Sequence, residues 1–167
     1  MRFDATLNLV NSATLADFTR PDLVVPELRE RDTAGIISEL SHVLRREGCV
    51  PDVLPFYHSA LNQELLANSA LECGLAFPHA RLSGIRQVQF AFGRAPQPVP
   101  WGAKGAWPVQ CIFLLAVPAT DATTYLQLLA SLARLGQQNG TLSHLRSAKS
   151  AAEVIAVLAG IKVRPAS

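Results

Sequence analysis

Residues 109–117 read Val-Gln-Cys-Ile-Phe-Leu-Leu-Ala-Val, an almost unbroken apolar run between two prolines. A strand with one wet face alternates polar and apolar residues, whereas a strand covered on both faces is apolar throughout. The run therefore predicts a central β-strand with helices on both sides of its sheet. Its longest uninterrupted part, from Cys111 to Val117, is far too short to span a bilayer, so we expect no membrane insertion.

Shorter apolar segments on the amino-terminal side predict the rest of the sheet. Residues 87–93 read Gln-Val-Gln-Phe-Ala-Phe-Gly and alternate polar with apolar, which is typical of a strand with one buried face. Residues 75–77 and residues 23–25 are short apolar stretches, each followed by a proline that ends a strand. The segment from residue 96 to 108 is rich in proline and glycine and is predicted to be a loop.

Apolar residues at helical spacing predict the helices that cover this sheet. The predicted helices span residues 33–46, 52–66, 121–138 and about 150–159. Asp32, Asp52 and Ser150 are candidate caps, the last within a capping box. A single further turn of helix is expected over residues 141–146, after a break at Gly140. These elements predict an α/β fold, a three-layer sandwich in which a mixed sheet of about four or five strands carries helices on both faces.

Composition indicates one folded domain. The chain has 167 residues, of which 49% are hydrophobic and 17% are charged, so it can bury a core and does not have the composition of a disordered chain. We expect an N-terminal extension over residues 1–14, one domain over residues 15–160 and a C-terminal tail over residues 161–167. The formal net charge is +2 and no run of like charge stands out, which argues against nucleic acid as a partner.

Several common site signatures are missing from the sequence. The three cysteines, Cys49, Cys73 and Cys111, have no CxxC spacing and are expected to be reduced thiols in a cytoplasmic protein, and the start of the chain lacks the pattern of a signal peptide. The four histidines form no metal-binding spacing, so no metal is expected. No GxxxxGK[ST], GxGxxG or GxSxG motif is present, so neither a nucleotide loop nor a serine-hydrolase elbow is predicted.

His79 is the residue on which candidate chemistry centres. It follows the short strand at residues 75–77 and Pro78, so its imidazole is expected at a strand end, where ligands bind in α/β folds. A neutral imidazole can act as a nucleophile. Arg81 and Arg86 follow His79 closely in sequence and could bind an anion. A histidine that only fills a loop explains the same pattern, so the residues alone leave both interpretations open.

A series of short motifs surrounds and follows this histidine. They are Ala76-Phe77-Pro78-His79-Ala80, Phe92-Gly93-Arg94, Val99-Pro100-Trp101-Gly102-Ala103, the apolar run that ends at Pro118, and Tyr125-Leu126-Gln127-Leu128-Leu129. In this order, over roughly residues 15–160, they resemble the enzyme IIA domain of the fructose/mannitol type in the bacterial phosphoenolpyruvate:sugar phosphotransferase system, a family that includes nitrogen-regulatory relatives.

The resemblance implies a phosphotransferase-type histidine phosphocarrier. In that family the histidine receives a phosphoryl group from the carrier protein HPr and passes it to a IIB partner, or serves as a regulatory signal. Carried over to this chain, His79 would be the phosphohistidine. No metal or organic cofactor is implied, since phosphoryl transfer needs mainly in-line positioning and charge neutralisation.

Three features depart from the family's pattern. The arginine that usually lies sixteen residues before the histidine is Gln63 here, and the histidine that opens the later helix is Tyr125. Both side chains can donate hydrogen bonds but neither is cationic, so the loss of the guanidinium should weaken transition-state stabilisation. Two loop glycines appear as Ala70 and Glu72, and we expect Glu72 to face solvent.

The departures leave alternatives open. The chain is a working phosphocarrier, or a non-catalytic regulatory module on the same fold that binds a protein partner or anion, or an unrelated histidine-dependent enzyme. Around His79 we expect Gln63 and Tyr125 as catalytic partners and Ser69 and Arg81 as binding residues, on a shallow and partly apolar surface. The sequence names no sugar, does not separate transport from regulation, and is compatible with a homo-oligomer.

Overall fold

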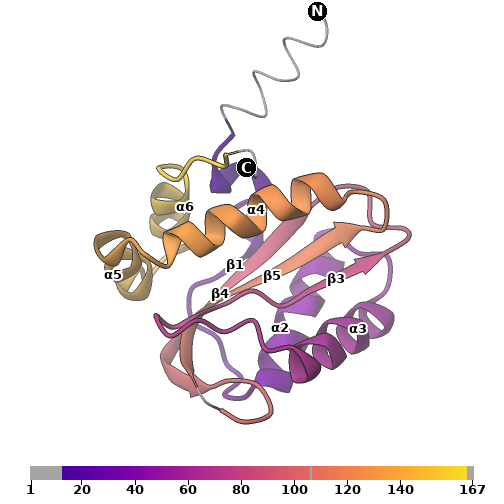
Figure 1. The fold of residues 1–167 in the computed structure, drawn as a ribbon, viewed down its shortest axis with the longest axis horizontal. Helices are drawn as coiled ribbons and strands as arrows, with labels where there is room; N and C mark the ends of the chain where they lie inside the picture. The colour runs from indigo at the N-terminus through magenta and orange to yellow at the C-terminus, as the bar shows by residue number, and fades with distance from the viewer. Residues whose placement is uncertain (1–12, 106, 165–167) are drawn as a thin grey trace, which may run out of the picture.

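A computed structural model describes residues 13–105 and 107–164 (Figure 1). Its centre is a mixed five-stranded sheet in the order β1-β4-β5-β2, with β3 also paired to β5. The strands are β1 (Val24–Val25), β2 (Leu75–Ala76), β3 (His79–Leu82), β4 (Gln89–Pro100) and β5 (Pro108–Pro118). The β4 and β5 strands are antiparallel, and the other pairings are parallel.

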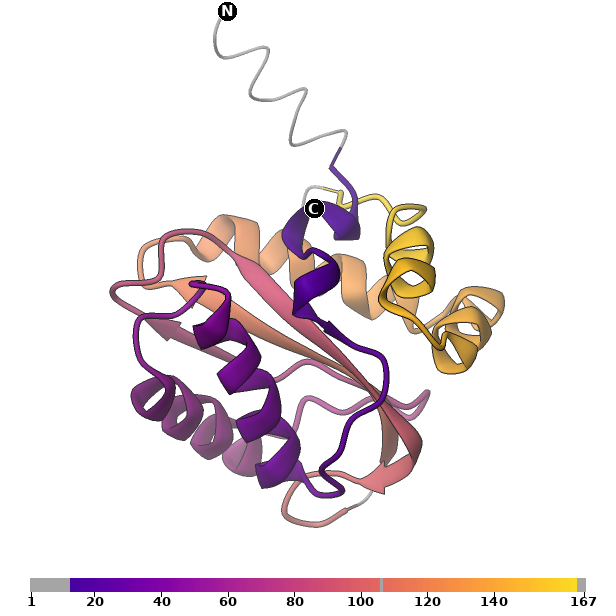
Figure 2. The same cartoon turned by 180° about the vertical axis from the view of Figure 1, so that it is seen from behind.

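Helices cover both faces of this sheet (Figures 1 and 2). One face carries α2 (Thr33–Arg46) and α3 (Val53–Leu66), and the other carries α4 (Ala122–Leu135), α5 (Asn139–Ser147) and α6 (Ala151–Leu158). Two short 3-10 helices, η1 (Leu15–Phe18) and η2 (Pro21–Leu23), precede β1. The predicted three-layer α/β sandwich is confirmed. Among the described helices, none combines the length and the apolar character that a membrane crossing requires.

The apolar run at residues 111–117 is the centre of the core. Every side chain in it is fully buried. Ile112 and Leu114 belong to the cluster under α2 and α3, whereas Phe113 and Leu115 belong to the cluster under α4, α5 and α6. The alternation of a strand thus sends successive side chains into two apolar layers, which is why the sequence shows no polar face here.

Side-chain caps begin three of the helices. Asp32 accepts a hydrogen bond from Gly35 N at 2.7 Å and Ser150 accepts one from Glu153 N at 3.1 Å, as predicted. Asp121 caps α4 in the same way. Asp52 is the N-cap residue of α3, as predicted, but its side chain accepts no hydrogen bond from the helix.

The proline-rich and glycine-containing segments differ most from prediction. The β4 strand continues to Pro100, through the start of the predicted loop, with a register irregularity between Arg94 and Val99. Prolines in this stretch lack the N–H that a regular ladder needs, yet their φ suits an extended chain. The break predicted at Gly140 is also wrong, because that residue lies in the first turn of α5.

The two ends of the described chain lie side by side. Leu15 N donates to Ile161 O and Val163 N donates to Ala13 O, both at 2.9 Å. Ile161 and Val163 are buried, so the first residues of the predicted tail pack into the fold. Residues 1–12 of the predicted extension lie outside the described residues.

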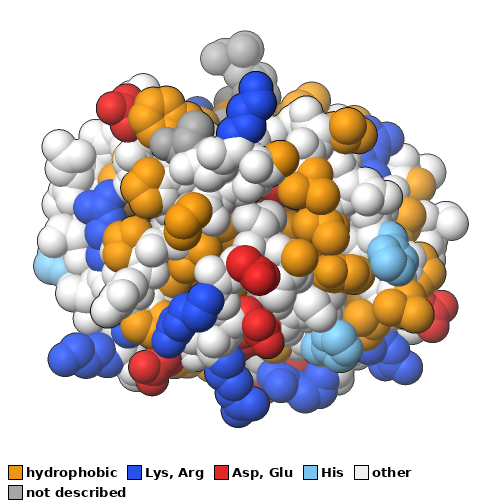
Figure 3. All heavy atoms as spheres, turned by 90° about the horizontal axis from the view of Figure 1, so that it is seen from below, with side chains coloured by type: hydrophobic (Ala, Val, Ile, Leu, Met, Phe, Trp, Pro, Cys, Tyr) orange, Lys and Arg blue, Asp and Glu red, His pale blue; other side chains and the backbone are white. Residues whose placement is uncertain are grey.

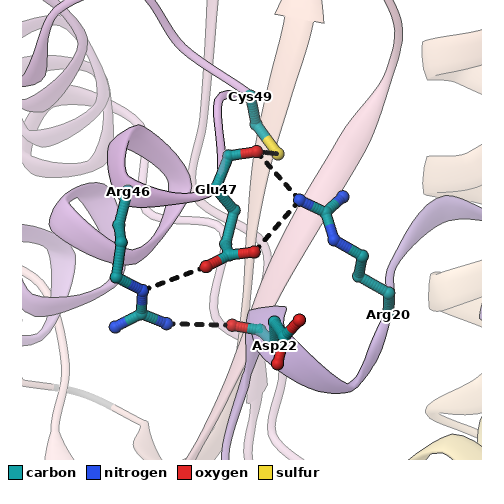
Figure 4. A network of polar contacts seen from close by, with 5 residues as sticks. All are labelled: Arg20, Asp22, Arg46, Glu47 and Cys49. Carbon is teal, nitrogen blue, oxygen red and sulfur yellow. Dashed lines mark hydrogen bonds and ion pairs between the residues drawn. The ribbon is translucent and has the colours of Figure 1, made fainter.

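A polar network fixes the segment before β1 to the end of α2 (Figure 4). Arg20 donates to the Glu47 carbonyl at 2.8 Å and to its carboxylate at 3.3 Å, and Arg46 donates to that carboxylate at 3.1 Å and to Asp22 O at 3.0 Å. Burial raises the pKa of the neighbouring Cys49 thiol. A protonated, buried thiol is a poor nucleophile, so Cys49 is not expected to be reactive. The network therefore has a structural role and joins the segment before β1 to the end of α2.

Candidate functional site

His79 is the first residue of β3 and lies beside Leu115 of the central strand. The sequence predicted it at a strand end; the structure places it at the beginning of the next strand, which the pattern did not predict. Pro78 ends the preceding segment, and its carbonyl accepts a hydrogen bond from Leu115 N at 2.9 Å. Ala80 packs into the cluster under α2 and α3. Strand alternation therefore directs His79 toward the opposite side, where α4 begins.

Two polar side chains from different layers meet the imidazole of His79. Gln63, near the end of α3, has its amide nitrogen 3.1 Å from His79 Nε2. Tyr125, near the start of α4, has its hydroxyl 3.1 Å from Nε2 and 3.4 Å from Nδ1, with ring centroids 4.8 Å apart. Both groups predicted beside His79 lie there, and both are directed at Nε2.

The surroundings of His79 favour its neutral form. Burial lowers the pKa of His79 below its ordinary value of 6.5, and the positive charge of Arg81 lowers it further, against a hydrogen bond to the Phe77 backbone and the negative charge of Glu64. A neutral imidazole has one N–H and one lone pair. The Gln63 amide nitrogen can only donate, so we assign the lone pair to Nε2 and the proton to Nδ1.

Tyr125 is held in its donor form. Burial raises the pKa of the Tyr125 hydroxyl, although the charge of Arg81 opposes the shift. A tyrosine that keeps its proton at neutral pH can donate to a lone pair or to an oxyanion, but it supplies no positive charge. The Gln63 amide is also a neutral donor, so the two groups in contact with Nε2 are both uncharged.

Ser69 contacts the residues around this site but does not contact the imidazole. Its hydroxyl donates to Glu64 Oε1 at 2.7 Å and accepts from Phe77 N at 2.8 Å. No hydrogen bond joins Ser69 to His79 within the described part of the chain. Ser69 thus anchors the segment that leads into His79, rather than touching the imidazole itself.

Glu64 is a functional candidate that the sequence pattern does not indicate. Only 2% exposed, it accepts three hydrogen bonds on Oε1: from Ser69 N at 2.9 Å, from Ser69 Oγ at 2.7 Å and from Trp101 Nε1 at 2.7 Å. The signal that could have found it is its position next to Gln63, together with a buried indole that needs an acceptor. Glu64 joins α3, the segment before His79 and the loop after β4.

Comparison with known proteins gives this arrangement a family. The family described as "Phosphoenolpyruvate-dependent sugar phosphotransferase system, EIIA 2" matches residues 17–160. The chain belongs to this EIIA type 2 family. A nitrogen regulatory protein of Bradyrhizobium diazoefficiens is 27% identical over 150 residues, which is 87% of this chain and 94% of that protein.

Solved structures of EIIA domains share the fold. The nitrogen regulatory protein IIA-Ntr of Neisseria meningitidis aligns with a TM-score of 0.71 and 28% identity, over 86% of this chain and 98% of that one. The enzyme IIA of the Escherichia coli mannitol system, solved in complex with phosphorylated enzyme IIB, aligns with a TM-score of 0.70 and 17% identity, over 85% of this chain and 99% of that one. The second likeness concerns the fold alone.

Arg81 is a cation on the same strand as the histidine of this EIIA domain. Two residues after His79 on β3, it projects from the same side of the strand. Its side chain is exposed and its Nη2 donates to Ala119 O at 2.9 Å, in the connection that leads from β5 to Tyr125. Glu72, the acidic residue of concern in the loop, is exposed as predicted.

Exposed leucines occur on the two helices that carry Gln63 and Tyr125. Leu66 on α3 is 90% exposed and Leu126 on α4 is 51% exposed, each close in sequence to a partner of His79. The face that carries α2 and α3 shows hydrophobic patches between charges of both signs (Figure 3). Within the described residues no cluster of three or more His, Cys, Asp or Glu side chains is placed to hold a metal ion.

Proposed function

We propose that this EIIA domain is a histidine phosphocarrier that accepts a phosphoryl group on Nε2 of His79. The observation that carries the proposal is the imidazole itself: it is held neutral and its Nε2 lies within 3.1 Å of Gln63 and Tyr125. A neutral imidazole with a directed lone pair is the nucleophile that phosphoryl transfer needs. The phosphoryl donor would be the phosphohistidine of an HPr-like carrier protein.

The transfer exchanges one nitrogen–phosphorus bond for another. The Nε2 lone pair of His79 attacks phosphorus, the bond to the donor's imidazole breaks, and its electron pair stays on the donor ring. Gln63 and Tyr125, which contact Nε2 in the unphosphorylated site, would then donate to the oxygens of the arriving group. Transfer onward reverses these steps toward the next acceptor.

The acceptor would be a IIB domain or a regulatory protein in the cytoplasm. The mannitol EIIA was solved with phosphorylated IIB, and two similar proteins are named nitrogen regulatory proteins. Both uses require that a partner reach His79. Leu66 and Leu126, which are exposed on the helices that carry Gln63 and Tyr125, would suit the apolar part of such a contact.

A second candidate is a non-catalytic regulatory module on the same fold. The observation that favours it is the absence of charge on Gln63 and Tyr125, since both donors to Nε2 are neutral. Such a module would bind a protein partner without forming phosphohistidine. Its binding would then survive the loss of the imidazole.

The two candidates separate in one experiment. The protein is incubated with phosphoenolpyruvate, enzyme I and HPr from the same organism, and intact mass is measured. We expect a gain of one phosphoryl group that disappears in His79→Ala and persists in His58→Ala, a control at an exposed histidine of α3. No gain with a complete and active partner set would refute the phosphocarrier, and partner binding that is unchanged in His79→Ala would then support the regulatory module.

A further inference from the structure

Phosphorylation of His79 brings an anion into a site whose contacting donors are neutral. A phosphoryl group carries a charge of about −1.5 to −2 near neutral pH. Gln63 and Tyr125 can donate hydrogen bonds to its oxygens but cannot neutralise that charge. Charged hydrogen bonds are roughly twice as strong as neutral ones, so a cation within reach of the site would dominate its affinity for the group.

Arg81 is such a cation. Its positive charge lowers the pKa of both His79 and Tyr125, so its field reaches the imidazole and the hydroxyl that face each other across the site. It shares a face of β3 with His79, and its guanidinium is held by Ala119 O at the start of the connection to α4. The ion pairs of the described residues involve other arginines, so no carboxylate there competes for Arg81.

We propose that Arg81 is the phosphoryl-binding cation of this site and supplies, from β3, the charge that Gln63 on α3 lacks. The inference rests on the proposed phosphocarrier function and goes one step beyond it. A guanidinium has five N–H donors, and one hydrogen bond to Ala119 O leaves the others for phosphoryl oxygens. Arg81 lies on β3 and Gln63 on α3, so the cation would come from a different element than the arginine that the family's pattern places at position 63.

A purely structural role for Arg81 makes different predictions. If Arg81 only fastened β3 to the connection before α4, its loss would lower stability, and a new cation at position 63 would not compensate. Gln63 lies on α3, in the helical layer opposite α4, and contacts Nε2, so an arginine there is not expected to rebuild the bond from position 81 to Ala119. Rescue from position 63 therefore reports charge at the phosphoryl group.

The test compares Arg81→Ala, Arg81→Gln, Gln63→Arg and the double variant Gln63→Arg/Arg81→Ala with the unmodified protein. The rate of His79 phosphorylation by purified phosphorylated HPr is measured in single turnovers. We expect Arg81→Ala and Arg81→Gln to be slower by about 10- to 100-fold, the span of one charged hydrogen bond, and the double variant to recover most of that loss. Arg45→Ala, at an exposed arginine of α2, is the matched control and should keep the full rate.

A second readout is the pKa of His79, followed by NMR titration of the imidazole. Because the charge of Arg81 lowers this pKa, Arg81→Ala and Arg81→Gln should both raise it. The proposal is overturned if Arg81→Gln keeps the full rate, or if the double variant stays as slow as Arg81→Ala. An unmodified protein that is never phosphorylated would instead refute the phosphocarrier function, so the two failures are distinguishable.

Discussion

The buried carboxylate of Glu64 offers a sharp test of how the site is held. Glu64→Gln keeps the shape of the side chain and removes its charge. In the native structure three donors converge on Oε1, two from Ser69 and one from the Trp101 indole. An amide oxygen can still accept these bonds, but each becomes a bond between neutral groups.

The magnitude follows from that count of bonds. A hydrogen bond to a charged acceptor contributes about 1.5–3 kcal/mol and one to a neutral acceptor about 0.5–1.5 kcal/mol, so each donor loses about 1 kcal/mol. Burying a neutral amide costs less than burying a carboxylate, which offsets part of the loss. We therefore expect the free energy of unfolding to fall by about 2 kcal/mol, or the Tm by about 4–8 °C.

Urea denaturation followed by circular dichroism measures this loss. Glu72→Gln is the matched control, because the same chemical change at an exposed position should stay within about 0.5 kcal/mol of the unmodified protein. Hydrogen exchange of the Trp101 indole, which is fully buried, should become faster in Glu64→Gln. The pKa of His79 should fall, since the charge of Glu64 raises it.

If Glu64→Gln is as stable as Glu72→Gln and the Trp101 indole exchanges no faster, Glu64 does not hold this network. A double variant that adds Trp101→Phe gives an independent check, because two groups in one hydrogen-bonded network should show a coupling energy of about 0.5–3 kcal/mol. Additive losses would contradict the contact.

Two further predictions concern proton uptake and the loop after β4. The phosphorylation rate should fall as pH drops and His79 gains a proton, with a midpoint below 6.5 because the pKa of His79 is lowered. The control His58→Ala should give the same pH profile. A midpoint at or above 6.5 would contradict the neutral imidazole as the nucleophile. Gly102→Ala should lose about 1–3 kcal/mol of stability in urea denaturation, since Gly102 has a φ of +76° and a Cβ there would meet the Asn68 side chain. Gly140→Ala, with no atom within 4 Å of the new Cβ, should be neutral or more stable by up to about 1 kcal/mol, and equal losses at both positions would argue against the strain.

The layers of the fold could be predicted because their signals are local. The apolar run at residues 111–117 specifies burial on both faces, and helical spacing predicts α2 and α3 to within a residue. The β3 strand and the far half of β4 could not be predicted in this way. A short segment after Pro78 and a stretch with three prolines resemble loops, and only pairing with β5 makes them strands.

The candidate site also contains residues that could be predicted from local motifs and residues that could not. His79, Gln63 and Tyr125 were expected together because their motifs occur in the order of the resembled family, and the structure brings them into contact. The parts played by Ser69 and Glu64 depend on contacts between segments far apart in sequence, above all the bond from Trp101. Nothing in the local pattern around Ser69 separates a residue that touches the imidazole from one that anchors its backbone.

Those anchoring contacts fix the backbone that carries His79. Glu64 accepts a hydrogen bond from the Ser69 hydroxyl, and that hydroxyl accepts one from Phe77 N, two residues before His79. This series of bonds fixes the segment that leads into His79, whose Nε2 is contacted by Gln63 and Tyr125. A site whose two contacting donors are neutral depends on that fixed placement, since hydrogen bonds weaken steeply when they are misaligned.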